Sequence, residues 1–212
     1  MAKRRRLVMM AMTMSAVVIC ACNRASAPPP VDQTKAAVPG TPSSTTAGQP
    51  VNEDAKALAE FLDRVNQYVV VHQKLENTLP KLSKESTPQQ VDEHQRALTK
   101  LLQDARKDAK QGDIFTPESQ RVIKKFIAKL FSGPEGASLK SSIMDENPGV
   151  PNLKVNSRYP DEIPVSTIPP QMLEWLPKLP EEMEYRFVGN DLILMDTHAH
   201  IIADFIPNAF AK

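Results

Sequence analysis

The stretch from Leu179 to Ile206 constrains the fold of this 212-residue chain most, because it holds the densest strand signals. Aromatic and β-branched residues alternate with charged ones near its start, and Gly189-Asn190 then offers the positive φ that a two-residue hairpin turn requires. Two further apolar runs follow, separated by a short turn. The pattern predicts an antiparallel three-stranded meander with strands at about 184–188, 192–197 and 200–206.

The second and third runs are apolar on both alternating sets, as in Leu192 and Leu194 beside Ile193 and Met195. This indicates a sheet that is covered on most of both faces. Three strands are marginally stable alone, so the helical sequence upstream must pack against them. We therefore expect an α+β fold in which residues 52–210 form a single domain.

Apolar residues at spacings of three and four predict a helical hairpin, a third helix and a shorter fourth. Asn52 is a candidate N-cap, Thr87 to Gln90 form a capping box, and Thr116-Pro117 begins the third helix. The predicted helices are about 53–79, 88–111, 117–132 and 137–145. The first is expected to bury an apolar stripe made of Leu58, Leu62, Val65, Val69, His72, Leu75 and Leu79.

Residues 146–180 contain frequent prolines and scattered apolar residues. This composition predicts an ordered strap that crosses the fold and joins the helices to the meander. The strap carries Trp175, the only tryptophan, which we expect to be a core anchor. The core itself is predicted to contain Leu62, Val69, Leu98, Phe126, Phe187, Leu194 and Ile202.

The N-terminal segment reads as an export signal. A basic run at residues 3–6 precedes an apolar run at residues 7–19, and Ile19-Cys20-Ala21-Cys22 resembles a bacterial lipobox. We predict a signal peptide at 1–21, a lipid-modified Cys22 and a disordered Pro/Ser/Thr/Ala-rich tether at 22–51. The alternative is simple secretion after Ala25-Ser26-Ala27, which would leave a soluble periplasmic or secreted protein.

The predicted lipid anchor determines the expected location and partners of the protein. The membrane is then a partner through Cys22. By resemblance to bacterial lipoproteins of cells with two membranes, Asn23 after Cys22 implies the outer membrane, with the folded part facing the periplasm. Loss of the signal removes four basic residues from a chain with 26 basic and 25 acidic ones. Nucleic-acid binding is therefore disfavoured, and an envelope protein or polymer is the expected partner.

Five segments carry a resemblance that spans most of residues 54–207: AKALAEFLDRVNQYVVVHQKLE, KQGDIFTPE, SIMDENPG, RYPDEIPVSTIPP and LPKLPEEMEYRFVGNDLILMDTHAHIIADFI. They resemble an uncharacterised family of exported bacterial proteins, which implies no known activity. Val188-Gly189-Asn190-Asp191 and its proline-rich lead-in are similar to the end of periplasmic nickel/cobalt-homeostasis proteins. A tryptophan usual in that lead-in is missing here, so this similarity assigns no site residue.

The segment from Asp196 to His200, Asp-Thr-His-Ala-His, looks like the first metal-ligand strand of amidohydrolases. Such enzymes need a barrel of about 200 residues or more, and only twelve residues follow His200. We reject that interpretation and expect His198 and His200 to be surface histidines at a turn. The sequence also lacks a phosphate-binding glycine loop, the Gly-x-Ser-x-Gly motif of serine hydrolases and a candidate cysteine nucleophile. We therefore predict no catalytic residues and no cofactor.

His72 and His94 lie on the apolar stripes of the first two helices, at similar heights in an antiparallel hairpin. Two imidazoles so placed form a candidate site for a divalent metal. The alternative is that each is a partly buried histidine with a local hydrogen bond. The sequence thus favours a non-catalytic binding or structural module of the envelope, with a metal-binding or metal-homeostasis protein using His72, His94, His198 and His200 as the alternative.

Labelling cells with a radioactive fatty acid should mark the protein, and Cys22→Ala should abolish the label because that sulfur carries the lipid. Cys20→Ala is the matched control and should keep the label. Loss of the label in Cys20→Ala but not in Cys22→Ala would show that the wrong cysteine has been assigned.

Overall fold

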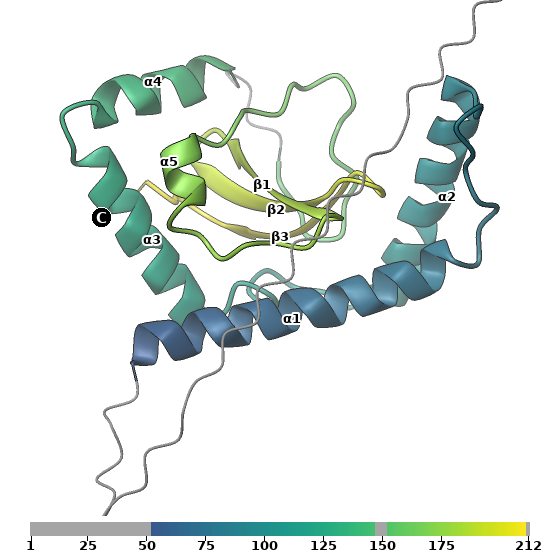
Figure 1. Ribbon diagram of the computed structural model, residues 1–212, viewed down its shortest axis with the longest axis horizontal. Coiled ribbons are helices and arrows are strands. Elements are labelled where there is room, and N and C mark those ends of the chain that lie inside the picture. Colours follow the sequence, from purple (N-terminus) through teal and green to yellow (C-terminus); the bar gives the residue numbers. More distant parts are fainter. Residues whose placement is uncertain (1–51, 147–151, 211–212) are drawn as a thin grey trace, which may run out of the picture. The chain divides into compact units, whose positions relative to one another are not determined.

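The computed structural model describes residues 52–146 and 152–210. The predicted signal peptide, tether and Cys22 lie outside these residues. The expected α+β architecture is confirmed, with helices preceding a C-terminal meander (Figure 1). Its elements are α1 (Glu53–Glu76), α2 (Pro88–Ala105), α3 (Pro117–Phe131), α4 (Gly136–Glu146), α5 (Pro170–Leu173), β1 (Met183–Val188), β2 (Asp191–Asp196) and β3 (Ile201–Ile206).

The sheet has the order β1-β2-β3, and both pairs are antiparallel. Gly189, at φ 56°, makes the tight turn between β1 and β2, and the first register pair there is Val188 with Asp191. A bulge between Leu194 and Met195 shifts the register against β3. The predicted strand bounds are therefore right to within one residue at each end.

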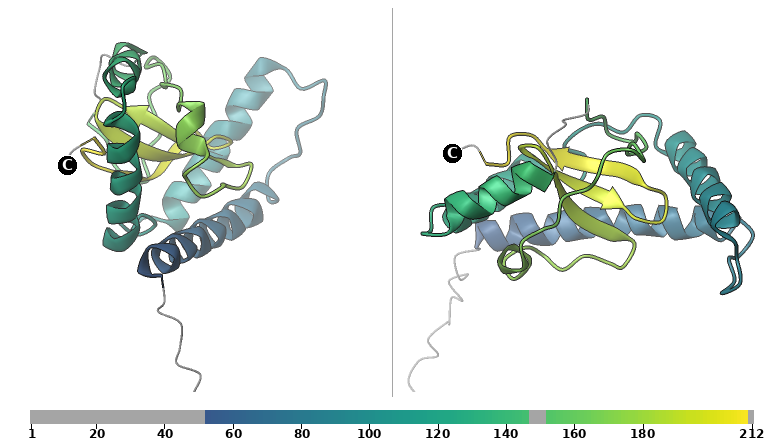
Figure 2. Two further views of the ribbon diagram at one scale, coloured as in Figure 1. Left: turned by 60° about the vertical axis from the view of Figure 1, so that its left-hand side comes forward. Right: turned by 90° about the horizontal axis from the view of Figure 1, so that it is seen from above.

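One face of the sheet packs against the helices and forms the main core (Figures 1 and 2). Alternate residues of β1 and β2 point into this layer, such as Phe187 and Leu194, both fully buried. They meet Phe61 and Val65 of α1, Leu98 of α2 and residues of α3, α4 and α5. All the described helices and strands thus contribute to one hydrophobic cluster.

The opposite face is covered by the strap, as its scattered apolar residues predicted. Ile193, Met195 and Ile202 form a second cluster there with Tyr159, and Leu153 packs against it. The strap also pairs with the outer edge of β3 through main-chain hydrogen bonds. Tyr159 N–H donates to His200, Asn156 N–H to Ile202, and Ile202 N–H to Ser157. This pairing protects one edge of the sheet from solvent.

The first two helices end earlier than predicted. α1 stops at Glu76 rather than 79, because tight-turn bonds from Thr78 to Leu75 and from Leu79 to Glu76 replace the helical pattern ahead of Pro80. α2 stops at Ala105 rather than 111. The helices α3 and α4 agree with their predicted bounds to within one residue.

A buried carboxylate organises the chain that follows α2. Asp204 on β3 is fully buried and accepts backbone N–H bonds from Gly112, Ile114 and Phe115 at 2.8–3.2 Å. Gly112 has φ 95°, which a helix does not allow. Burial raises the pKa of Asp204, and the backbone hydrogen bonds oppose that change. Residues 112–115 therefore wrap around this side chain beyond the end of α2.

Several predictions about the core are wrong in detail. α1 buries Phe61, Val65, Tyr68, Val69 and His72, so its inner face is rotated relative to the predicted stripe, and Leu62 is only partly buried. Phe126 is half-buried, and Trp175 is 37% exposed at the rim. The tryptophan packs edge-on against Phe126 and lies beneath the ammonium group of Lys129, because the short α5 places it at the surface.

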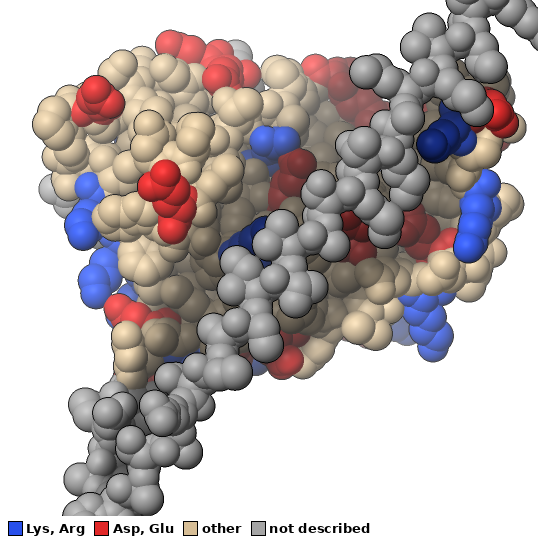
Figure 3. All heavy atoms as spheres, viewed as in Figure 1, with Lys and Arg blue, Asp and Glu red and all other residues tan. Residues whose placement is uncertain are grey.

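Blue and red side chains are interspersed over the face drawn in Figure 3, outside the part that grey atoms cover. Acidic and basic residues are frequently paired within one element or across two, as in Arg64 with Glu60 and Arg121 with Asp54. Among the described residues, no helix is long and apolar enough to cross a membrane.

The core makes a direct stability prediction. Leu98→Ala should lower the free energy of unfolding by about 2–5 kcal/mol, because it leaves a cavity at a fully buried position. Leu82→Ala is the matched control, since Leu82 is 44% exposed and should change stability little. Urea denaturation measures both, and equal midpoints for the two variants would contradict the assignment of Leu98 to the core.

Candidate metal centre

The candidate centre begins at the C-terminal end of α1. His72 and Glu76 are four residues apart, so their side chains lie on the same face of the helix. His72 is fully buried, whereas the Glu76 side chain is 30% exposed. The His72 Nε2 atom lies 3.3 Å from a carboxylate oxygen of Glu76.

Asp196, at the end of β2, is hydrogen-bonded to the His72 ring. Its position in the strand puts it on the helix-facing side, where it is fully buried. One carboxylate oxygen accepts from the Tyr68 hydroxyl at 2.7 Å and from His72 Nδ1 at 2.5 Å. The other accepts from the backbone N–H of Ala199 at 2.8 Å. Because a carboxylate only accepts, the His72 proton sits on Nδ1 and leaves Nε2 facing Glu76.

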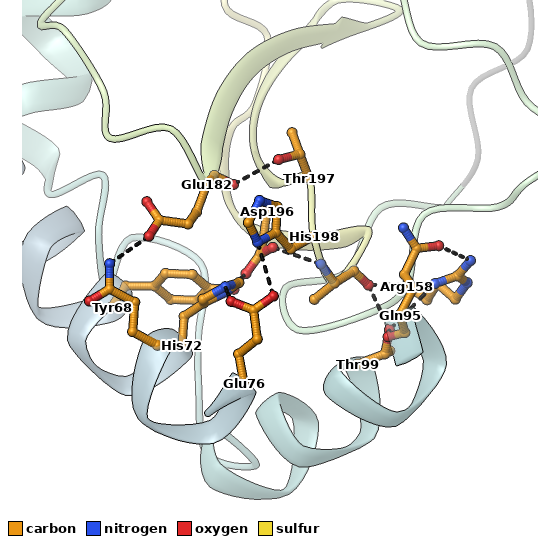
Figure 4. A network of polar contacts seen from close by, with 12 residues as sticks. Tyr68, His72, Glu76, Gln95, Thr99, Arg158, Glu182, Asp196, Thr197 and His198 are labelled. Carbon is orange, nitrogen blue, oxygen red and sulfur yellow. Dashed lines mark hydrogen bonds and ion pairs between the residues drawn. The ribbon is translucent and has the colours of Figure 1, made fainter. Parts of the chain in front are cut away.

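His198 approaches Glu76 from the turn between β2 and β3 (Figure 4). Its Nδ1 atom lies 3.1 Å from the second carboxylate oxygen of Glu76, and its ring centroid is 5.4 Å from that of His72. The turn is held in place by the Asp196 bond to Ala199 and by Thr99 of α2, which donates to the Ala199 carbonyl at 2.6 Å. The His198 side chain itself is 43% exposed.

His94 reaches the same carboxylate from α2. Its Nε2 atom lies 3.6 Å from the Glu76 oxygen that His198 contacts. Its Nδ1 atom donates to the main-chain carbonyl of Pro80 at 3.1 Å. His94 therefore presents Nε2 to Glu76 in the same sense as His72 does, from the other helix of the hairpin.

His200 does not join the group. It adopts φ 53° and places its Nε2 atom 3.7 Å from Asp161, with its ring edge-on to Tyr159. Burial and the nearby Arg158 lower the pKa of His200, against the opposing charge of Asp161. Of the four histidines named from the sequence, the structure thus brings together His72, His94 and His198.

The electrostatics of His72 reflect two carboxylates around one buried ring. Burial opposes its protonation, but the hydrogen bond and charge of Asp196, together with the charge of Glu76, raise the pKa of His72 above its usual value. Burial and the adjoining Asp196 also raise the pKa of Tyr68, so its hydroxyl remains a donor. The site therefore favours a positive charge at the nitrogen that faces Glu76.

The spacing suits a small cation. One ligand atom from each of His72, Glu76 and His198 can be chosen so that all lie within 4.8 Å of one another. A tetrahedral ion with bonds of about 2.1 Å brings its ligand atoms to about 3.4 Å apart. His72 Nε2 lies 3.3 Å from one carboxylate oxygen of Glu76 and His198 Nδ1 lies 3.1 Å from the other, and both distances are close to that value.

The sequence interpretation missed the two acidic residues of the site. Glu76 carries a weak signal, its place four residues after His72 on one helix face. Asp196 was seen only as the first residue of an Asp-Thr-His-x-His motif. The interpretation of His198 as a surface histidine at a turn is right about its exposure and omits its contact with Glu76.

Comparison with known proteins adds no assignment. No family model, no curated protein and no solved structure matches this chain. The predicted resemblance to exported bacterial proteins stays a prediction, and function must be inferred from the geometry of the site.

Asp196→Asn should lower the free energy of unfolding by about 2–4 kcal/mol, because an amide offers one acceptor oxygen where Tyr68, His72 and Ala199 now donate to two. Asp108→Asn, at an exposed aspartate, is the control and should leave stability almost unchanged. Urea denaturation in the presence of EDTA measures both variants, and a stable Asp196→Asn protein would show that the network does not support the fold.

Proposed function

We propose that this protein binds a divalent transition-metal ion through His72, Glu76 and His198, with His94 beside them. One observation carries the proposal. Three imidazole nitrogens from two helices and a turn converge on the single carboxylate of Glu76, at 3.1–3.6 Å.

The protonation pattern explains why a cation suits this point. His72 and His94 each donate Nδ1–H to another acceptor, so the neutral rings present a bare lone pair from Nε2. A lone pair that faces a carboxylate oxygen is repulsive unless a proton or a metal ion lies between them. One metal ion would satisfy His72, Glu76 and His198 together, because a ligand atom from each lies within 4.8 Å of the other two.

The donor set selects the class of metal. Imidazole with a single carboxylate suits Zn²⁺, Ni²⁺, Co²⁺ or Cu²⁺, whereas Ca²⁺ and Mg²⁺ prefer sites made of oxygen atoms. A bound ion would act there as a Lewis acid and would hold α1 and the β2–β3 turn together, with His94 of α2 beside them.

The histidines of the site have hydrogen-bond partners of the kind that orient metal ligands. Metal-binding histidines usually donate their second ring N–H to a carboxylate or a main-chain carbonyl, which fixes ring orientation. Asp196 plays this part for His72 and Pro80 for His94. Asp196 is held in turn by Tyr68, so the orientation of His72 depends on a hydrogen-bonded chain and not on a single contact.

The proposed setting is the bacterial envelope. The export signal and the Cys22 lipobox favour a lipid-anchored protein whose folded part faces the periplasm, and the tether would let that part move away from the membrane. Metal binding by a non-catalytic module fits this setting, and it agrees with the local similarity to periplasmic nickel/cobalt-homeostasis proteins.

The experiment compares two histidines of one turn. The full-length protein is stripped with EDTA, and Zn²⁺, Ni²⁺ and Co²⁺ are titrated calorimetrically. His198→Gln should weaken binding at least about tenfold, because it removes a direct ligand. His200→Gln is the matched control and should bind like the wild type, since His200 faces Asp161 instead.

Two results would overturn the proposal. The first is a wild-type protein that binds none of the three ions. The second is binding that His198→Gln leaves unchanged, because the ion would then lie elsewhere. Circular dichroism of each variant checks that the fold is retained.

A further inference from the structure

Two adjoining cavities open beside the proposed metal centre. The first has a volume of about 290 Å³ and is lined by Glu76, Asn77, Lys81, Leu82 and His94. The second, about 320 Å³, shares Lys81, Leu82 and His94 with the first. Both are lined by the 77–87 loop and by His94 of α2, and the first is also lined by Glu76 at the end of α1.

A metal ion at this place would keep a free coordination position. His72, Glu76 and His198 supply a ligand atom each, and a four-coordinate ion needs one more. Closed structural sites fill that position with protein, whereas open sites leave it to water or to a bound molecule. His72 is fully buried, whereas Glu76 and His94 line the first cavity, so this cavity lies on one accessible side of the ion.

Lys81 supplies a second recognition point. It lines both cavities, and within residues 52–146 and 152–210 its ammonium group makes no ion pair or side-chain hydrogen bond. A lysine ammonium is a compact charge that pairs well with a carboxylate. The first cavity thus brings the positive charge of Lys81 together with the side chains of Glu76 and His94.

We infer that these cavities bind a small organic carboxylate, which coordinates the metal ion with one end and pairs with Lys81 at the other. The inference rests on the metal-binding function proposed above and names the class of molecule that would accompany the ion. Leu79, Leu82 and Ala97 line the remaining wall and would contact the carbon skeleton. The volume lies at the lower end of the usual range for ligand pockets, which limits the molecule to a few carbon atoms.

Binding of the anion should depend on the metal. Glu76 lines the first cavity and Glu93 the second, and both offset the charge of Lys81 when no ion is bound. A divalent ion reverses that balance at the place where the carboxylate would enter. The metal and the carboxylate should therefore bind cooperatively.

The test uses malonate as the probe and Co²⁺ as a visible metal. Full-length protein is loaded with Co²⁺, and its absorption in the visible region is followed while malonate is added. The spectrum should change saturably, whereas the uncharged analogue malonamide should cause no change. Lys81→Met should raise the malonate concentration at half-saturation at least tenfold and leave Co²⁺ affinity within about twofold.

Lys84→Met is the matched control, because Lys84 lies in the same loop and is absent from the lining of both cavities. It should respond to malonate like the wild type. A wild-type protein that binds no Co²⁺ would overturn the proposed metal function. Co²⁺ binding with no response to malonate, an equal response in Lys81→Met, or loss of Co²⁺ to malonate on ultrafiltration would instead overturn this inference alone.

Discussion

The buried carboxylate of Asp196 is the contact on which the arrangement of the site depends. Burying an ionised carboxylate costs several kcal/mol unless hydrogen bonds compensate for the lost water. Here the compensation comes from Tyr68 and His72 of α1 and from the backbone of Ala199. Both α1 residues must face the strand at once, so the rotation of α1 about its axis is fixed, and Glu76 is placed one helical turn beyond His72.

Asp204 fixes a second part of the structure in the same way. Asp196 and Asp204 belong to neighbouring strands, and each collects donors from a segment far away in sequence. Apolar packing alone would let the helices slide or turn over the sheet, since it is not directional. Two buried acceptors that must meet particular donors remove that freedom. The hydrophobic core thus stabilises the layers, and these two carboxylates determine how the layers are aligned.

The sequence predicted what local patterns control and missed what tertiary contacts decide. Turn residues and alternation gave the strands to within one residue, because Gly189 and the apolar runs act locally. The inner face of α1 was wrong because Leu62 and Phe61 are equally apolar, and the choice between them depends on where Asp196 meets Tyr68 and His72. For the same reason, the sequence named four histidines, but it did not show which three of them meet or which carboxylate gathers them.

The position of the proposed centre has a thermodynamic consequence. Its proposed ligands come from α1 and the β2–β3 turn, with His94 of α2 beside them, and these elements meet only when the helices are packed on the sheet. In an unfolded chain only His72 and Glu76 remain near each other, because they are four residues apart in the sequence. The ion would therefore bind the native state far more tightly. Binding of this kind stabilises the fold by about 2.7 kcal/mol when the free ion is at a hundred times its dissociation constant. Metal would therefore reinforce the same junction of helices and turn that Asp196 establishes, and occupancy of the site would be coupled to the stability of the whole domain.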